Sequence, residues 1–462
     1  MAAQREPNER LRTLLAEARW TGQGLARAVN AIGAESGRRL RYTRASVAHW
    51  LAGVRPRSPV PELIAEAFSR RLGRPITVRA VGLAEPDESP ASGAARWTTA
   101  PVAATAADIA GALAELGSAD ADPARRAELR GAVYTLALPP PPRGAARRQG
   151  RVEAAAAATG PSDWPGQVEA AAWVANFFSD ADAAFGGGHA RSALAAYLAS
   201  DIAPRLRPAG APATHGRMLA AAANLTYLCG FMCFDDTMHG AAQRYYAIAL
   251  RLAAAAEDRQ AYGVVLRAMS VQAHYLGHHV HALHLAEAAV TGGSRAARPA
   301  TRAFLLGQLA VARAGVGDRG ALADMRAAER ALDRRDSTSD VIGAYHRAAL
   351  DHQRAEMLVA LGDRTGAIAA LTSSLRHRPR TERRARTITL ARLAGLQLDH
   401  GHLEAAVETW HRFLDDYPYL RCGRADAALA TLRARIRPYR GNVAAGTLWR
   451  RAASPPEPPP GL

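Results

Sequence analysis

The sequence predicts an all-α protein with an N-terminal helix-turn-helix domain, a linker and a C-terminal α-solenoid. Apolar residues recur at helical spacing through most of the chain. Turns centred on glycine return 40, 45 and 39 residues apart in the second half. A Pro- and Ala-rich stretch separates the two helical parts. We therefore expect a domain at 1–84, a linker at 85–165, helical repeats at 166–440 and a disordered tail at 441–462.

The charge of the chain is concentrated near its N-terminus. The 462 residues carry a net charge of +17, and all 59 basic residues are arginine. Residues 1–83 hold 15 Arg and 6 Glu with no Asp, a net charge of +9. This asymmetry favours a nucleic-acid partner for the N-terminal domain.

Four short amphipathic helices are expected in the N-terminal domain, at 8–19, 23–32, 43–53 and 61–72. In the third, Thr43 can cap the N-terminus and Gly53 can end the helix in a left-handed conformation. The spacing buries Val47, Trp50 and Leu51 and turns four side chains outward: Arg44, Ala45, Ser46 and His49. Such residues can read base edges from a helix in the major groove, although an ordinary surface helix has the same pattern.

Residues 43–53, Arg55-Pro56 and the helix that begins Pro-Glu-Leu-Ile at 61–64 resemble phage-repressor-like helix-turn-helix domains. The resemblance implies that Arg44, Ala45 and His49 read bases and that Ser46 touches phosphate. The family's turn between the two groove helices is a few residues long, whereas 30–42 is much longer here. Either the second helix extends or a loop protrudes.

A basic run surrounds this helix. Between positions 38 and 57 there are six arginines and no Asp or Glu. A solvated face is the alternative, but next to a recognition helix such a run can neutralise phosphates. The residues expected to contact phosphate are Arg38, Arg39, Arg41, Thr43, Ser46, Arg55 and Arg57.

The linker is expected to contain two short helices, at 108–116 and 125–138. Arg125-Arg126 before an apolar run is similar to a twin-arginine export signal, but it lies behind a folded domain and far from the N-terminus. We interpret this segment as a helix that docks on a neighbouring domain. The Pro139–142 run and residues 143–160 after it should be extended or mobile.

The repeats are defined by turns at Gly277, Gly317, Gly362 and Gly401. In three of the four, alanine follows five positions after glycine, which lets two helices approach closely. The pattern is similar to tetratricopeptide repeats with degenerate periods, which stack because each helix pair leaves an apolar face for the next. The resemblance implies a concave face that holds a peptide, a small molecule or a partner protein.

A second resemblance covers 8–83 and 167–415. Residues 185–191, 197–198, 239–246 and 275–278 are similar to a group of actinobacterial regulators that join a helix-turn-helix domain to tetratricopeptide-like repeats and control sporulation and antibiotic production. The group shares no effector that maps to residues here. Gly186-Gly187-Gly188 lacks a following lysine, so we interpret it as a turn and not as a phosphate loop.

Aromatic residues concentrate in the second and third helical pairs. Most are expected in the core, and some can line an effector groove, since tyrosine offers apolar area with a polar end. The candidates are Tyr227, Phe231, Tyr245, Tyr246, Tyr262 and Tyr275.

The sequence predicts no catalytic residue, no metal site and no cofactor. His274 and His278 are one turn apart, but the pair straddles a glycine turn and no carboxylate accompanies it as in HExxH. Cys229, Cys233 and Cys422 are too few for a disulfide framework and suit a reducing cytoplasm. No apolar stretch long enough for a bilayer and no signal-peptide layout is found, so we expect a cytoplasmic, nucleoid-associated protein without membrane contact.

Two functions compete. In the first, the protein is a transcription regulator, a repressor of development or secondary metabolism, that binds a double-stranded DNA operator as a homodimer; its repeats sense a ligand or dimerise. In the second, it is an interaction scaffold whose helix-turn-helix domain is vestigial or a docking module.

Overall fold

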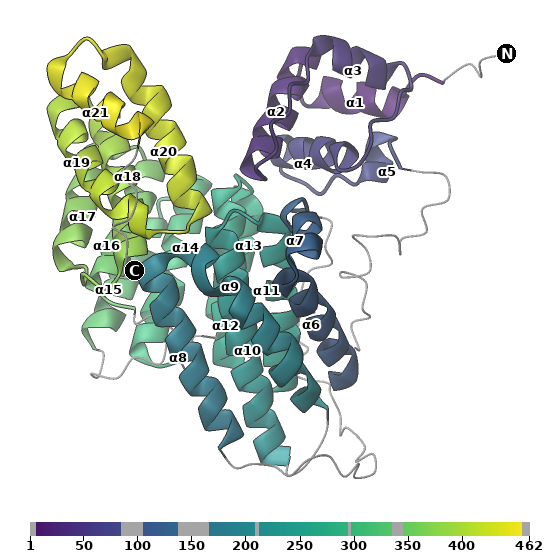
Figure 1. Ribbon diagram of the computed structural model, residues 1–462, viewed down its shortest axis with the longest axis vertical. Helices are drawn as coiled ribbons and strands as arrows, with labels where there is room; N and C mark the ends of the chain where they lie inside the picture. The colour runs from purple at the N-terminus through teal and green to yellow at the C-terminus, as the bar shows by residue number, and fades with distance from the viewer. Residues whose placement is uncertain are drawn as a thin grey trace.

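The computed structural model describes residues 6–84, 105–136, 166–207, 212–293, 297–334 and 345–454, and these residues form helices and turns without a strand. The all-α prediction is confirmed. The N-terminal domain contains α1 (Glu9–Glu17), α2 (Gly22–Glu35), α3 (Arg44–Leu51), α4 (Val60–Leu72) and α5 (Val78–Val81), and it stands apart from the remaining helices in Figure 1.

The five helices of the N-terminal domain share one apolar core. Leu11, Leu25, Leu63, Ile64 and Phe68 have no exposed surface. Burying a side chain of this size contributes about 1.5–3 kcal/mol. The small domain is therefore held by a core of its own.

The long turn between α2 and α3 is anchored to α2. The helix extends to Glu35, and the Asn30 side chain donates to the Tyr42 carbonyl oxygen and accepts from the Tyr42 N–H, both at 2.9 Å. Leu40 lies over Gly33, where a Cβ would collide with it. Of the two expected alternatives, the structure has the extended helix, with the turn folded back against it.

The two helices in the described part of the linker belong to the second domain. The helix expected at 108–116 is longer, α6 (Ala106–Ala121), and its Leu113 and Leu116 are fully buried in the core shared with later helices. α7 (Pro123–Arg130) ends eight residues before the expected end of the docking helix, and 132–136 are not helical. Residues 85–104 and 137–165 of the expected linker lie outside the described residues.

The second domain continues with α8 (Gln167–Phe185), α9 (Gly187–Tyr197) and two short turns, η3 (Leu198–Ile202) and η4 (Ala203–Leu206). Five helix pairs follow, and the two helices of each pair pack against each other. They are α10 (Pro212–Asp235) with α11 (His239–Ala255), α12 (Arg259–Tyr275) with α13 (His279–Gly293), α14 (Pro299–Gly315) with α15 (Ala321–Asp333), α16 (Arg347–Ala360) with α17 (Arg364–His377), and α18 (Arg383–Asp399) with α19 (Leu403–Asp416).

The four predicted glycine turns each separate the two helices of a pair, with glycine φ values of 84°, 81°, 88° and 85°. These are left-handed values that glycine adopts without steric cost. The alanines five positions after three of these glycines, Ala282, Ala367 and Ala406, have no exposed surface. The predicted close approach of the paired helices is thus confirmed.

The two ends of the array meet. The Arg421 N–H donates to the Phe185 carbonyl oxygen at 2.8 Å, and the Gly188 N–H donates to the Arg421 carbonyl oxygen at 2.9 Å. A Cβ at Gly186, where φ is 85°, would lie 2.6 Å from the same Arg421 oxygen. The triple glycine is therefore a point of close backbone approach, as the interpretation of a turn requires.

The expected disordered tail is wrong for most of its length. After η5 (Tyr417–Tyr419), α20 (Gly423–Ile436) and η6 (Arg437–Tyr439), residues 443–453 form α21 (Val443–Ala453). Ala445, Leu448 and Ala452 have no exposed surface because α21 packs against α19 and α20. Residues 455–462 lie outside the described part of the chain.

Within the described residues, one helix is long and apolar enough to cross a membrane, Ala213–Asp235. Its most apolar window is 78% buried inside the second domain. The helix is accounted for as a core element.

Candidate nucleic-acid interface

The helix α3 is fixed in the N-terminal domain at its start and along one face. The Arg44 N–H donates to Gln23 Oε1 of α2, and the Thr43 N–H donates to Ser46 Oγ, both at 3.2 Å. Val47 and Trp50 are buried, and the Trp50 ring meets Tyr42 edge-on with 5.1 Å between ring centroids. Gln23 is a residue that sequence reasoning missed, although its place in the first turn of a helix before α3 was visible.

The opposite face of α3 is open. Arg44, Ala45 and His49 are all exposed, as the spacing predicted. Ser46 is partly buried and its hydroxyl serves the start of the helix. The three exposed side chains offer a guanidinium, a methyl group and an imidazole, each able to meet a base edge.

Four of the six glutamates of the domain are held in ion pairs. Arg70 lies 2.8 Å from both Glu35 and Glu66, Arg74 lies 2.8 Å from Glu17, and Arg12 lies 2.8 Å from Glu9. Among the described residues, five arginines of the domain around α3 form no ion pair: Arg39, Arg41, Arg44, Arg55 and Arg57. No carboxylate offsets the positive charge of these five side chains, so this surface attracts a polyanion.

Arg38 is placed differently from the other predicted phosphate contacts. Its Nε is buried without a hydrogen-bond partner, and its guanidinium lies against Gly131, where a Cβ would collide with it. Arg38 therefore faces the segment after α7, and this corrects its assignment to a phosphate-contacting surface. The exposed candidates that remain are Arg39, Arg41, Thr43, Arg55 and Arg57.

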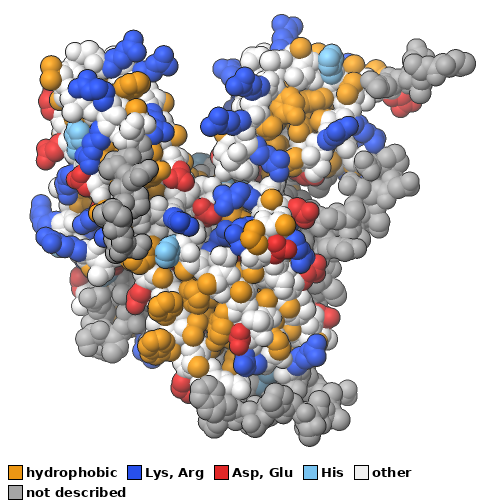
Figure 2. All heavy atoms as spheres, in the orientation of Figure 1, with side chains coloured by type: hydrophobic (Ala, Val, Ile, Leu, Met, Phe, Trp, Pro, Cys, Tyr) orange, Lys and Arg blue, Asp and Glu red, His pale blue; other side chains and the backbone are white. Residues whose placement is uncertain are grey.

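The face that carries α3 is not covered by the second domain. In Figure 1, α3 lies on the side of the N-terminal domain away from the helix pairs, whereas α4 lies on the side toward them. Figure 2 shows arginine side chains at the top of this domain and along its left edge, where α2 lies in Figure 1. The placement leaves room for a large ligand against α3.

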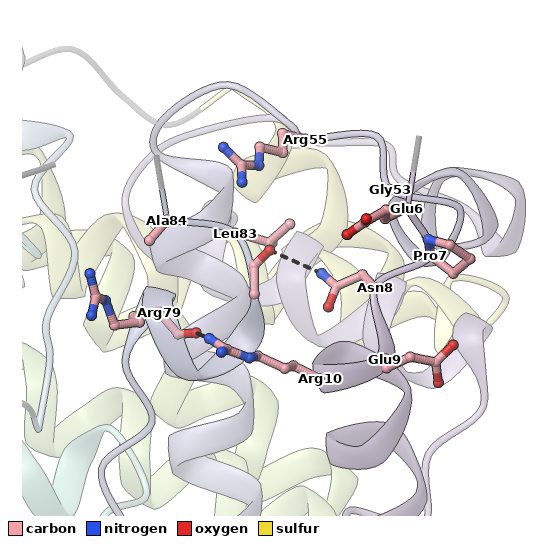
Figure 3. A pocket seen from close by; sticks show the side chains of 11 residues that line it. Glu6, Pro7, Asn8, Glu9, Arg10, Gly53, Arg55, Arg79, Leu83 and Ala84 are labelled. Carbon is pink, nitrogen blue, oxygen red and sulfur yellow. Dashed lines mark hydrogen bonds between the residues drawn. The ribbon is translucent and has the colours of Figure 1, made fainter. Parts of the chain in front are cut away.

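A hollow of about 760 Å³ lies beside the end of α3 (Figure 3). Asn8, which donates to the carbonyl oxygens of Val81 and Gly82 at 3.0 and 3.3 Å, holds the chain start against α5. Arg10, Arg55 and Arg79 line the hollow together with Glu6 and Glu9. The charge beside the end of α3 is therefore mixed.

The predicted effector-groove residues divide by burial. Tyr245 and Tyr246 have no exposed surface, so they belong to the core and do not line an open groove as expected. Tyr227 is 7% exposed, Phe231 and Tyr262 are partly buried, and Tyr275 is 48% exposed. Tyr275 packs edge-on against Phe234 at 5.4 Å between centroids.

The two histidines one turn apart in the sequence, His274 and His278, have different partners in the structure. His278 is buried and its Nε2 lies 2.7 Å from Glu66 Oε1 of α4, while His274 Nδ1 lies 3.4 Å from His279 Nδ1. The contact of His278 with the N-terminal domain was missed, because nothing local in the sequence indicates which helix covers a turn. The positions of His274 and His278 are explained by their packing contacts.

Cys229 and Cys233 are buried, as expected for core residues. With Asp120 their ligand atoms lie within 4.8 Å of one another. Asp120, however, already pairs with Arg191 and accepts from the Tyr245 hydroxyl at 3.2 Å. The carboxylate is thus neutralised by a cation of the chain itself, and the group is best explained as a buried polar network.

One comparison with known proteins gives a match. A family model described as the SP15 N-terminal domain matches residues 11–84, which corresponds to α1–α5. Neither the curated proteins nor the solved structures contain a match to this chain. The similarity covers the domain that carries α3.

Proposed function

We propose that the chain is a sequence-specific DNA-binding transcription regulator whose N-terminal domain inserts α3 into the major groove of an operator. The observation that carries the proposal is the group of unpaired arginines around α3. Four of the domain's glutamates pair with Arg12, Arg70 and Arg74, whereas five arginines around α3 have no ion pair among the described residues. The arrangement suits phosphates around a helix that reads bases.

In this proposal Arg44, Ala45 and His49 read bases, and Arg39, Arg41, Arg55 and Arg57 position the domain on phosphates. A homodimer on two half-sites about 34 Å apart gives the affinity that one small domain lacks. The helix pairs, which resemble tetratricopeptide repeats, dimerise the protein or sense an effector. By the same resemblance the regulated genes belong to development or secondary metabolism, with repression as the mode.

The test is selection of bound fragments from GC-rich genomic DNA by the full-length protein at two salt concentrations. The Arg44→Ala/His49→Ala variant is run beside it, with Arg74→Ala as the control because the charge of Arg74 is already paired with Glu17. We expect one recurrent motif that survives the higher salt with the wild type and with Arg74→Ala, and that disappears in the double variant. Bulk binding in all three proteins that washes out with salt would reject the proposal.

The interaction scaffold is kept as a second candidate because of a surface on α8. Trp173 and Phe177, one helical turn apart, are 73% and 58% exposed. Adjacent exposed aromatic side chains are a feature of protein interfaces. Capture of a partner that requires Trp173, together with an empty DNA selection, would favour this function.

A further inference from the structure

The second domain contains an arginine that no carboxylate neutralises. Arg267 lies in α12, is partly buried, and has no hydrogen bond or ion pair within the described residues. Its Nε is inaccessible to solvent and has no hydrogen-bond partner. Its two terminal nitrogens also have no hydrogen-bond partner among the described residues, but they are accessible to solvent. Burying the Nε in this way is costly, because its lost hydration is not replaced.

Other arginines of the second domain are different. Arg384 lies 3.0 Å from Asp182, Arg392 lies 2.8 Å from Glu356, and Arg424 lies 2.7 Å from Asp235. The domain thus provides carboxylates for the cations on α18 and α20. Among the described residues it provides none for Arg267, although α12 packs against both α10 and α14.

Aromatic side chains fix the direction of this guanidinium. Its central carbon lies 3.7 Å from the centroid of the Phe304 ring on α14, so the two groups stack. The titratable groups that act on it are Tyr227, Tyr345 and Tyr246, and burial lowers the pKa of Arg267. A stacked guanidinium keeps its edge free, and the edge carries the N–H groups that bind an oxyanion.

We propose that Arg267 is the anchor of a ligand site in the second domain, and that the ligand is a small organic acid whose carboxylate pairs with the free edge of the guanidinium. One guanidinium matches one carboxylate in charge and in two-point geometry. A phosphate, with more charge, calls for further donors, and no second unpaired cation faces Arg267 among the described residues. Phe304 and Tyr227, which are 9% and 7% exposed, make the surroundings of the guanidinium apolar, and this favours an aromatic or other apolar acid.

The site adds an effector to the proposed regulator, but its argument does not use DNA binding. The experiments are accordingly separate. Thermal unfolding of the full-length protein is followed with benzoate, with the neutral benzamide and with inorganic phosphate, all at the same ionic strength. The variants are Arg267→Met, which keeps the length and apolar contacts of the stem, and Arg302→Met, a control at an exposed arginine of the adjacent α14.

Without ligand, Arg267→Met should raise Tm by about 2–4 °C, because an unpaired charge is removed. Arg302→Met should leave Tm unchanged. Benzoate should raise the Tm of the wild type and of Arg302→Met, and should do nothing to Arg267→Met. Benzamide and phosphate should have no effect on any of the proteins.

A lower Tm in Arg267→Met would overturn the proposal, since it would mean that the charge is already satisfied in the fold. An equal response to phosphate or benzamide would also overturn it. If Arg267→Met does not fold, Arg267→Gln is measured in its place. Failure of both variants to fold would reject a ligand-binding role in favour of a structural one.

Discussion

His278 Nε2 lies 2.7 Å from Oε1 of Glu66, and this buried contact joins the turn between α12 and α13 to the helix α4 of the N-terminal domain. Arg70 holds the same carboxylate at 2.8 Å, and the Tyr134 ring lies over His278 with 5.3 Å between centroids. The N-terminal domain is therefore attached to the helix pairs at a defined place. A change in the helix pairs at this turn would move the domain that carries α3.

Replacing His278 by alanine should loosen this attachment. Glu66 would keep its burial and lose one partner, which costs about 1–3 kcal/mol. We expect a larger radius of gyration in small-angle scattering and faster amide exchange in α4. His284→Ala, at an exposed histidine of α13, is the control, and equal scattering curves for His278→Ala and wild type would contradict the expectation.

Gly187→Ala should destabilise the second domain where α9 packs against α10. A Cβ at this position would lie 2.5 Å from the Met232 carbonyl oxygen, which is backbone and cannot move aside. We expect a loss of about 1–3 kcal/mol in the free energy of unfolding. Gly216→Ala, at a position with no atom within 4 Å of the added Cβ, should be neutral or stabilising by up to about 1 kcal/mol. Chemical denaturation compares the two, and equal stabilities would show that the junction is loose.

Lowering the pH should reduce the free energy of unfolding, because the buried His239 resists protonation in the folded protein. This side chain is 5% exposed and neither ring nitrogen has a hydrogen-bond partner among the described residues. Burial, reinforced by the charges of Arg70 and Arg424, lowers the pKa of His239 to about 3. The unfolded chain then takes up the proton near its ordinary pKa of about 6.5, well before the folded chain does.

The contribution of His239 to stability is accordingly complete above about pH 6.5 and is lost as the pH falls toward the folded value. The expected slope is about 1.4 kcal/mol per pH unit for this one histidine. His239→Phe should remove that part of the slope when denaturation is measured between about pH 6 and pH 4. His284→Phe is the exposed control; identical slopes in His239→Phe and wild type would refute the assignment.

The sequence predicted those parts of the fold that depend on local chemistry. Glycine marks the turns at 277, 317, 362 and 401 because φ is positive there. The turns before α11 and α12 have the same geometry at Thr237 and Glu257, with φ of 59° and 55°, so they carried no glycine signal. The helix α21 was hidden by Arg and Pro around it, although Ala445, Leu448 and Ala452 have helical spacing.

The candidate site was predictable in part for the same reason. Spacing along one short helix sufficed to turn Arg44, Ala45 and His49 outward. The direction of Arg38 depends on Gly131, and the burial of Tyr245 depends on Asp120. Contacts between residues so far apart in the chain leave no local pattern in the sequence. For the same reason the sequence does not reveal that Arg267 lacks an ion-pair partner.

The central claim is that α3 reads bases, and its most direct measurement is the ratio of affinities for the selected motif and for a scrambled DNA of equal length. We expect Arg44→Ala and His49→Ala each to cost about 1–3 kcal/mol of binding free energy on the selected motif. The affinity for scrambled DNA should stay almost unchanged, so the ratio falls. Arg39→Ala should weaken both affinities equally and reduce their salt dependence. A ratio that stays the same in Arg44→Ala and His49→Ala would contradict the account.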